Sequence, residues 1–312
     1  MAVKFGLFAP QGWRQDLAEI ADPIAQYEAM TRVARAADAE AYDSVWVFDH
    51  FHPAPPREPA PTFECWTIMA TLARDTERIR LGQLVTCAGF RSPALLAKIA
   101  STVDVASHGR LNVGIGAGWY EDEWRAYGFG FPDALERLQM LRETVEILQR
   151  MWTEEAPVFA GTHHRIDQPI NEPKGVQRPH PPLWIGGGGE RVTLKLVAQW
   201  ADACNINGDP ATIRHKLAVL RQHCAAVGRD DSEIVKSTCV LIQLVERAED
   251  VDRVTVAPVR MESVIIGTPA MVREQLQTFV DAGVDYFIVT LPRVAYDQEP
   301  LRRFARDVVS LF

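Results

Sequence analysis

The chain has 312 residues, of which 47% are hydrophobic and 24% charged, and its formal net charge at pH 7 is −8. This is the composition of a globular protein that can bury a large core, and a negative charge without a dense run of Lys or Arg argues against a nucleic-acid binder. The five cysteines are scattered and form no Cys-x-x-Cys pair, which argues against a zinc site or a disulfide framework and fits a reducing compartment.

Short apolar runs alternate along the chain with stretches of helical periodicity. The predicted strands cover residues 3–8, 45–48, 79–86, 111–116, 183–185, 201–207, 235–245 and 285–291. The predicted helices cover residues 23–37, 63–73, 93–103, 133–152, 190–200, 211–227, 269–282 and 300–311, and residues 247–263 are left unassigned. The chain starts directly in a strand-like segment and has no apolar run long enough to cross a bilayer, so we expect a cytoplasmic protein without a membrane partner.

Eight strand-helix units in succession predict a parallel α/β fold. Their number and the chain length favour a closed (β/α)8 TIM barrel, with an open doubly wound sheet as the alternative. Composition gives no sign of a linker, so residues 1–312 are expected to form a single domain. Residues 153–182, rich in Pro, His, Gln and Gly, interrupt the rhythm, and a connection of this length in a compact domain predicts a lid-like insertion.

The second predicted strand ends abruptly in Asp49 and His50. Catalytic groups of such barrels lie at the C-terminal ends of the strands, and a carboxylate beside an imidazole is costly to bury without partners. We therefore predict that His50 is the acid/base or electrostatic centre of a site and that Asp49 orients it. The alternative is an aspartate that caps a turn beside a solvated histidine.

Glycines mark two further strand ends. Residues 186–189 are four glycines that open into a predicted helix, where backbone N–H groups favour a phosphate; the alternative is a tight turn that needs glycine at positive φ. Residues 114–118 fail the GxGxxG dinucleotide pattern because Trp119 stands where glycine is required. Close approach of a flat ligand explains these glycines, unless they only fit a crowded barrel interior.

Other candidate groups carry weaker signals. His163, His164 and His180 have no carboxylate at ligand spacing, so no metal site is predicted. Cys87 has no histidine nearby in sequence and is expected to line a pocket rather than to act as a nucleophile. The acidic run 121–123 is interpreted as a solvated helix start, although one of its acids could face the pocket.

Taken together, these segments resemble the bacterial luciferase-like monooxygenase family, and within it the branch that depends on the deazaflavin coenzyme F420. The resemblance runs from the first strand to the last predicted helix. The matching segments are residues 48–51, 64–66, 79–82, 84–86, 91–98, 109–111, 116–119, 181–187, 201–202 and 267–269.

The resemblance implies a barrel whose mouth holds an isoalloxazine or deazaflavin ring. The ring would rest against a bulge with a non-prolyl cis bond between Leu84 and Val85, with His50 beside it and the phosphate on glycines 187–189. Some relatives carry a catalytic glutamate at the position of Trp119, and this departure argues against their sugar-phosphate dehydrogenase mechanism. The expected cofactor-binding residues are Leu84, Val85, Thr86, Cys87, Gly116, Ala117, Gly118, Trp119, Gly187, Gly188, Gly189 and Asn205.

The resemblance predicts an oxidoreductase that passes a hydride between carbon 5 of F420 and a small organic substrate. Trp119, Phe51, Cys87 and the lid would form the substrate pocket. The alternatives are a monooxygenase that uses reduced FMN and oxygen, and a cofactor-binding protein without catalysis. The family also implies a homodimer, on analogy alone.

Overall fold

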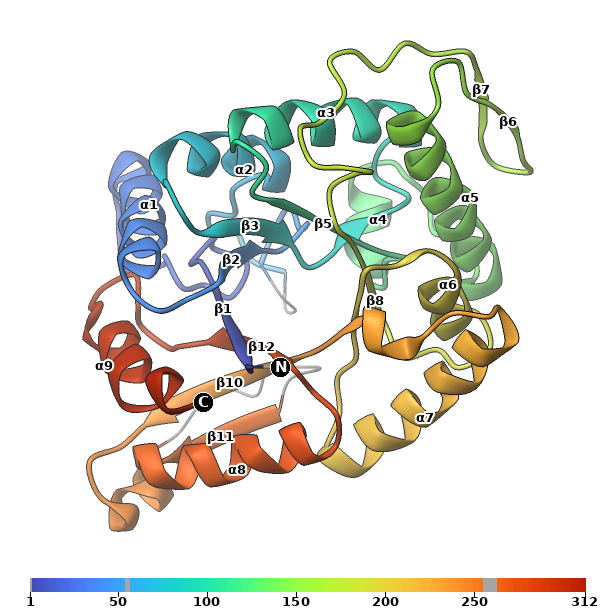
Figure 1. Cartoon of the computed structure of the whole chain (residues 1–312). Helices are drawn as coiled ribbons and strands as arrows, with labels where there is room; N and C mark the ends of the chain where they lie inside the picture. The colour runs from blue at the N-terminus through green and yellow to red at the C-terminus, as the bar shows by residue number, and fades with distance from the viewer. Residues whose placement is uncertain (1, 54–56, 255–262) are drawn as a thin grey trace.

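The computed structural model describes residues 2–53, 57–254 and 263–312. Within them, parallel strands close into a ring surrounded by helices, which confirms the predicted (β/α)8 barrel (Figure 1). The ring closes because β1 pairs with β12 and β9 pairs with β10. In ring order the strands are β1 (Lys4–Phe8), β2 (Ser44–Val47), β3 (Arg80–Gln83), β5 (Leu111–Gly116), β8 (Leu183–Gly186), β9 (Ala203–Asn205), β10 (Val235–Leu244) and β12 (Tyr286–Thr290).

Several helices of the outer layer start where the sequence supplies a cap. Asp22, Asp209 and Thr268 each accept a hydrogen bond from a backbone N–H of the first turn, and a proline follows each of them. None of the helices in the described ranges is both long and apolar enough to cross a membrane. The helices are α1 (Pro23–Ala39), α2 (Cys65–Asp75), α3 (Pro93–Ala106), α4 (Glu121–Ala126), α5 (Ala134–Thr153), α6 (Thr193–Trp200), α7 (Pro210–Ala226), α8 (Pro269–Asp281) and α9 (Glu299–Asp307).

Aromatic side chains fill the lower barrel interior. Trp46 and Trp184 are buried, and their rings meet edge to face with centroids 4.7 Å apart. Gly82 permits this packing, since a Cβ there would lie 2.4 Å from the Trp46 ring. Side chains therefore fill the barrel interior below the C-terminal ends of the strands, and a ligand must bind at the mouth that these strand ends form.

Two strands depart from the predicted elements. The predicted strand 79–86 is split into β3 and β4 (Thr86–Cys87), and the Leu84–Val85 bond between them is cis, as the resemblance implied. In the unassigned stretch 247–263 the structure has a 3-10 helix at Ala248–Arg253, and residues 255–262 lie outside the described ranges. The stretch ends in β11 (Ser263–Gly267), which pairs with the second half of β10. One edge of β10 is occupied by β12, so β11 lies on the other edge, where β9 pairs with the start of β10.

The insertion 153–182 contains a short antiparallel hairpin, β6 (Val158–Ala160) and β7 (Arg165–Asp167). The buried Glu143 carboxylate of α5 holds its tip by accepting hydrogen bonds of 2.8–2.9 Å from the backbone N–H groups of Thr162, His163 and His164. Figure 1 shows the hairpin outside the barrel, beside α5.

The prediction that this insertion is a lid over the mouth is wrong. Further along it, Val176 and Gln177 donate backbone hydrogen bonds to Asp104 near the end of α3, and the Gln177 side chain reaches the carbonyl of Leu111 where β5 begins. A connection from a helix to the next strand runs to the end of the barrel opposite the strand C-termini. None of the described residues that line the cavity comes from this insertion.

Candidate active site

A cavity of about 750 Å³ opens where the barrel strands end, within the usual size range of ligand pockets. The last residue of β1, β5, β8 and β9 lies in its wall, so several strand ends converge there. The predicted site residues in its lining are Asp49, His50, Leu84, Val85, Cys87, Gly116, Ala117, Gly118, Trp119, Gly187, Gly188 and Asn205.

Three residues predicted to face a ligand are not in this lining. Thr86 is fully buried, because successive residues of a strand point to opposite sides and Cys87 takes the cavity side. Gly189 lies beyond the cavity wall. Phe51, predicted for the substrate pocket, packs behind the wall with its ring 4.9 Å from that of Phe90.

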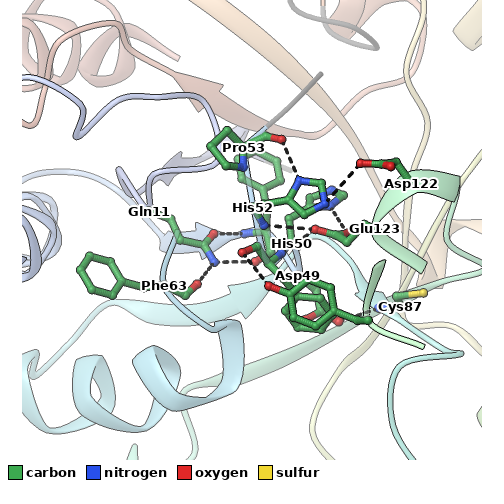
Figure 2. A network of polar contacts seen from close by, with 12 residues as sticks. Gln11, Asp49, His50, His52, Pro53, Phe63, Cys87, Asp122 and Glu123 are labelled. Carbon is green, nitrogen blue, oxygen red and sulfur yellow. Dashed lines mark hydrogen bonds and ion pairs between the residues drawn. The ribbon is translucent and has the colours of Figure 1, made fainter. Parts of the chain in front are cut away.

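His50 lies in the cavity wall and is held on two sides, and Figure 2 shows its contact with Glu123 on one of them. Its Nδ1 lies 2.8 Å from Oε2 of Glu123, and Trp13 stacks on its ring with centroids 4.4 Å apart and planes 6° from parallel. The amide of Gln11 binds both the N–H and the C=O of Phe48, which fixes the end of β2 from which His50 projects. The imidazole is therefore positioned before any ligand binds.

Glu123 comes from α4 and has no exposed side-chain surface. Its other oxygen, Oε1, accepts hydrogen bonds from the backbone N–H groups of Phe51 at 2.5 Å and His52 at 3.4 Å. A carboxylate with these partners can only accept from His50, so Nδ1 carries a proton and Nε2 is the nitrogen available to a ligand. His50 and Glu123 thus form a hydrogen-bonded imidazole–carboxylate pair.

Asp49 does not orient His50, and that prediction is wrong. Its carboxylate, also without exposed surface, accepts from both terminal nitrogens of Arg91 at 2.6 and 2.8 Å and from the backbone N–H of Cys87 at 2.9 Å. Arg91 also binds Glu64 at 2.6 Å. Burial acts to lower the pKa of Arg91, but Asp49 and Glu64 outweigh it and raise the pKa above its usual value. Adjacent side chains of an extended segment point apart, so Asp49 ties β2 to the start of α3 while His50 faces α4.

One wall of the cavity is shaped by glycine. A Cβ on Gly116 or Gly186 would lie 2.6 or 2.7 Å from the Val85 side chain, so these two strand ends remain bare where Val85 projects. Trp13 and Trp119 are among the aromatic residues that line the same cavity. A bare wall and aromatic side chains around one cavity of this volume fit a flat polycyclic ring.

The segment 186–189 does not open directly into a helix as predicted, because α6 begins only at Thr193. Gly187 has φ +120°, which favours glycine, and its N–H donates to the carbonyl of Asn205. Gly186, Gly187 and Gly188 line the cavity together with Thr193. Bare backbone beside a helix start is suited to a phosphate group.

Cys87 lines the cavity without the features of a nucleophile. Burial raises the pKa of its thiol well above the usual value, so the reactive thiolate is disfavoured. This agrees with its expected role as a small pocket-lining residue.

The sequence did not identify three side chains that shape the site, namely Glu123, Arg91 and Trp13. Glu123 stands in the acidic run that was noted as able to place one acid in the pocket, and it is the one with no exposed side-chain surface. Arg91 falls in a segment that carried the family resemblance, yet no spacing rule connects it with Asp49. Trp13 lies in the loop after β1 and had no recognisable signal.

Comparison with known proteins identifies related sequences. The family model for luciferase-like monooxygenases matches residues 3–260. The F420-dependent glucose-6-phosphate dehydrogenase of Kineococcus radiotolerans is 26% identical over 313 residues, covering 88% of this chain and 90% of the relative. The FMNH2-dependent dimethylsulfone monooxygenase of Pseudomonas putida is 26% identical over 288 residues, covering 80% and 78%.

Solved structures share the fold. An F420-dependent secondary alcohol dehydrogenase in complex with an F420–acetone adduct has a TM-score of 0.83 at 20% identity, with both chains covered completely. The EDTA monooxygenase of Chelativorans sp. has a TM-score of 0.84 at 15% identity, covering 100% of this chain and 93% of the other. At these identities the likeness establishes the barrel architecture alone.

Proposed function

Because the chain belongs to the luciferase-like monooxygenase family, we propose that it is an F420-dependent oxidoreductase acting on a small organic substrate. The observation that carries this proposal is the His50–Glu123 pair in the wall of a cavity suited to a flat ring. Relatives named as F420-dependent dehydrogenases align over most of the chain and support the choice of cofactor.

The residues of the cavity fit a deazaflavin with a phosphate tail. Val85 and the bare strand ends at Gly116 and Gly186 would bear the ring, and Gly187 and Gly188 would receive the phosphate. When bound, the deazaflavin supplies or accepts a hydride at carbon 5. The protein contributes position and electrostatics.

His50 provides the proton that such a reaction needs. Reduction of a carbonyl adds a hydride to carbon and a proton to oxygen, and oxidation of an alcohol removes both. Nε2 of His50 gives the proton to the substrate oxygen in one direction and takes it in the other, while Glu123 balances the charge on the imidazole. Trp13, stacked on the ring, stabilises its charged form through cation–π attraction.

A second candidate is a monooxygenase that uses reduced FMN and oxygen. The named FMNH2-dependent relative supports it, and the cavity suits a flavin ring as well as a deazaflavin. A binding titration with F420, FMN and FAD, followed by absorbance and fluorescence quenching, separates the two candidates. Oxygen consumption on addition of reduced FMN, with weak F420 binding, would favour the monooxygenase.

The catalytic part of the proposal is tested by His50→Ala. We expect turnover to fall by roughly 10²–10⁴-fold with little loss of cofactor binding. His52→Ala is the matched control, because His52 lies two residues further on and outside the cavity lining. Unchanged turnover in His50→Ala would remove this residue from the chemistry, and absence of turnover with either cofactor would favour a protein that binds without catalysis.

A further inference from the structure

Beside the glycine segment lies a cluster of charged side chains that the proposed chemistry does not use. The Glu190 carboxylate accepts hydrogen bonds from Nζ of Lys216 at 2.6 Å and Nε2 of His215 at 3.1 Å. Nε2 of His223 lies 2.7 Å from the Glu190 carbonyl. All three partners belong to α7, which runs beside α6 (Figure 1). The hydrogen bonds from Lys216 and His215 lower the pKa of the Glu190 carboxylate below its usual value, the one from Lys216 most, so Glu190 is ionised at neutral pH.

Lys216 reaches the cavity wall from behind. A Cβ placed on Gly188 would touch Cε and Cδ of Lys216 at 3.7 and 3.8 Å, and Gly188 lines the cavity. The Lys216 side chain is 23% exposed and that of Glu190 is 41% exposed. A flexible lysine stem can therefore move its ammonium from Glu190 toward a ligand on Gly188 without displacing the core.

We propose that Lys216 is the cation that binds the phosphate group of the ring cofactor at Gly188, and that Glu190 is its partner while the site is empty. This inference rests on the proposed function, since it requires a phosphate-tailed ring in the cavity. A phosphate at Gly188 brings negative charge next to Glu190, whose carboxylate then repels it. Transfer of Lys216 from Glu190 to the phosphate replaces an ion pair at the surface by a charge-assisted contact with the bound anion.

The opposite signs expected for two variants separate this role from a purely structural one. Lys216→Ala removes the cation, so the affinity for a phosphate-bearing ring should fall about tenfold, which corresponds to ~1.4 kcal/mol. Glu190→Gln removes the competitor and the repulsion, so the affinity should rise severalfold. If the pair only fastened the glycine segment to α7, both substitutions would weaken binding.

The experiment titrates the full-length protein with four ligands: F420, its phosphate-free precursor ring, FMN and riboflavin. In Lys216→Ala we expect weaker binding of the phosphate-bearing forms and unchanged binding of the phosphate-free forms, together with a weaker dependence of affinity on salt. Lys195→Ala, which removes an exposed lysine of α6 outside the cavity lining, controls for net charge. Thermal unfolding of each variant checks that the fold is intact.

Two results overturn the inference while the proposed function stands. One is wild-type binding of F420 or FMN that Lys216→Ala leaves unchanged or reduces equally for the phosphate-free rings. The other is a loss in Glu190→Gln as large as that in Lys216→Ala. If the wild-type protein binds none of the four rings, the proposed function fails and this inference fails with it.

Discussion

Glu123→Gln is the most informative substitution in the site, because it keeps the size of the side chain and removes only its charge. In the wild type one oxygen accepts from two backbone N–H groups and the other accepts from Nδ1 of His50. A glutamine cannot satisfy both sides. If its oxygen keeps the Phe51 N–H, its amide N–H₂ faces Nδ1, which must then give up its proton. If the amide flips, its N–H₂ meets the Phe51 N–H, donor against donor.

The expected effect follows from the hydrogen bond that is lost. Hydrogen bonds to charged groups contribute about 1.5–3 kcal/mol, and each 1.36 kcal/mol is tenfold in rate. Turnover should therefore fall by roughly 10–100-fold. Cofactor affinity should change little, because Glu123 supports His50 and not the glycine wall. A neutral imidazole with its proton on Nε2 would present a donor to the cavity where the wild type presents an acceptor.

Nitrogen-15 NMR of labelled histidine tests the tautomer without any substrate. At alkaline pH the wild-type protein should show His50 protonated on Nδ1, and Glu123→Gln should show it protonated on Nε2, with the signal assigned from a His50→Gln sample. Glu121→Gln is the matched control, since Glu121 is on the same helix and binds only the exposed Arg125 among the described residues. An unchanged tautomer together with turnover within threefold of wild type would refute the assignment of Glu123 as the positioning residue.

Two further predictions concern stability. Arg91→Met leaves the Asp49 carboxylate buried without its cation and should lower the free energy of unfolding by about 3–5 kcal/mol. In urea titrations, the double variant with Asp49→Asn should recover more than half of that loss. No recovery would show that the unpaired Asp49 carboxylate is not the cause of the loss. Burial raises the pKa of Asp16 from 3.8 to about 6, although the hydrogen bond from the Gly12 N–H acts to lower it. The folded state therefore binds this proton more tightly than the unfolded state does. As a result, the folded state loses stability as the pH rises from about 4 through 6. Asp16→Asn should stabilise the protein by about 1 kcal/mol at pH 8, a value reduced for its partial exposure, and leave it unchanged near pH 4; an equal effect at both pH values in thermal unfolding would contradict this.

The barrel could be predicted from the sequence because short apolar runs mark many of the strands and several helices begin at a recognisable cap. Asp22, Asp209 and Thr268 cap helices where proline follows them in the sequence. The insertion 153–182 was misplaced because length alone says that a connection is unusual and not which end of the barrel it occupies. Its position is fixed by Glu143 and Asp104, buried acids on helix faces that sequence periodicity does not distinguish from solvated ones.

Within the site, the strand ends could be located but not the pairing of their side chains. His50 was placed correctly in the cavity wall because it follows a buried strand. Its partner is 73 residues away on α4, and the neighbour in sequence, Asp49, is turned to Arg91. Adjacency along an extended chain separates side chains, so the partner of a strand-end residue must come from another element, and a single sequence carries no record of that contact.

Closure of the ring also has a consequence for synthesis of the protein. β1 pairs with β12 through Lys4 and Tyr286, so one edge of β1 has no neighbour until the last strand has left the ribosome. At about 5–20 residues per second, that interval is on the order of 15–55 seconds. During this time an open edge of the sheet is exposed to other nascent chains. The need for chaperone binding to the nascent chain should therefore increase with the time between synthesis of β1 and synthesis of β12.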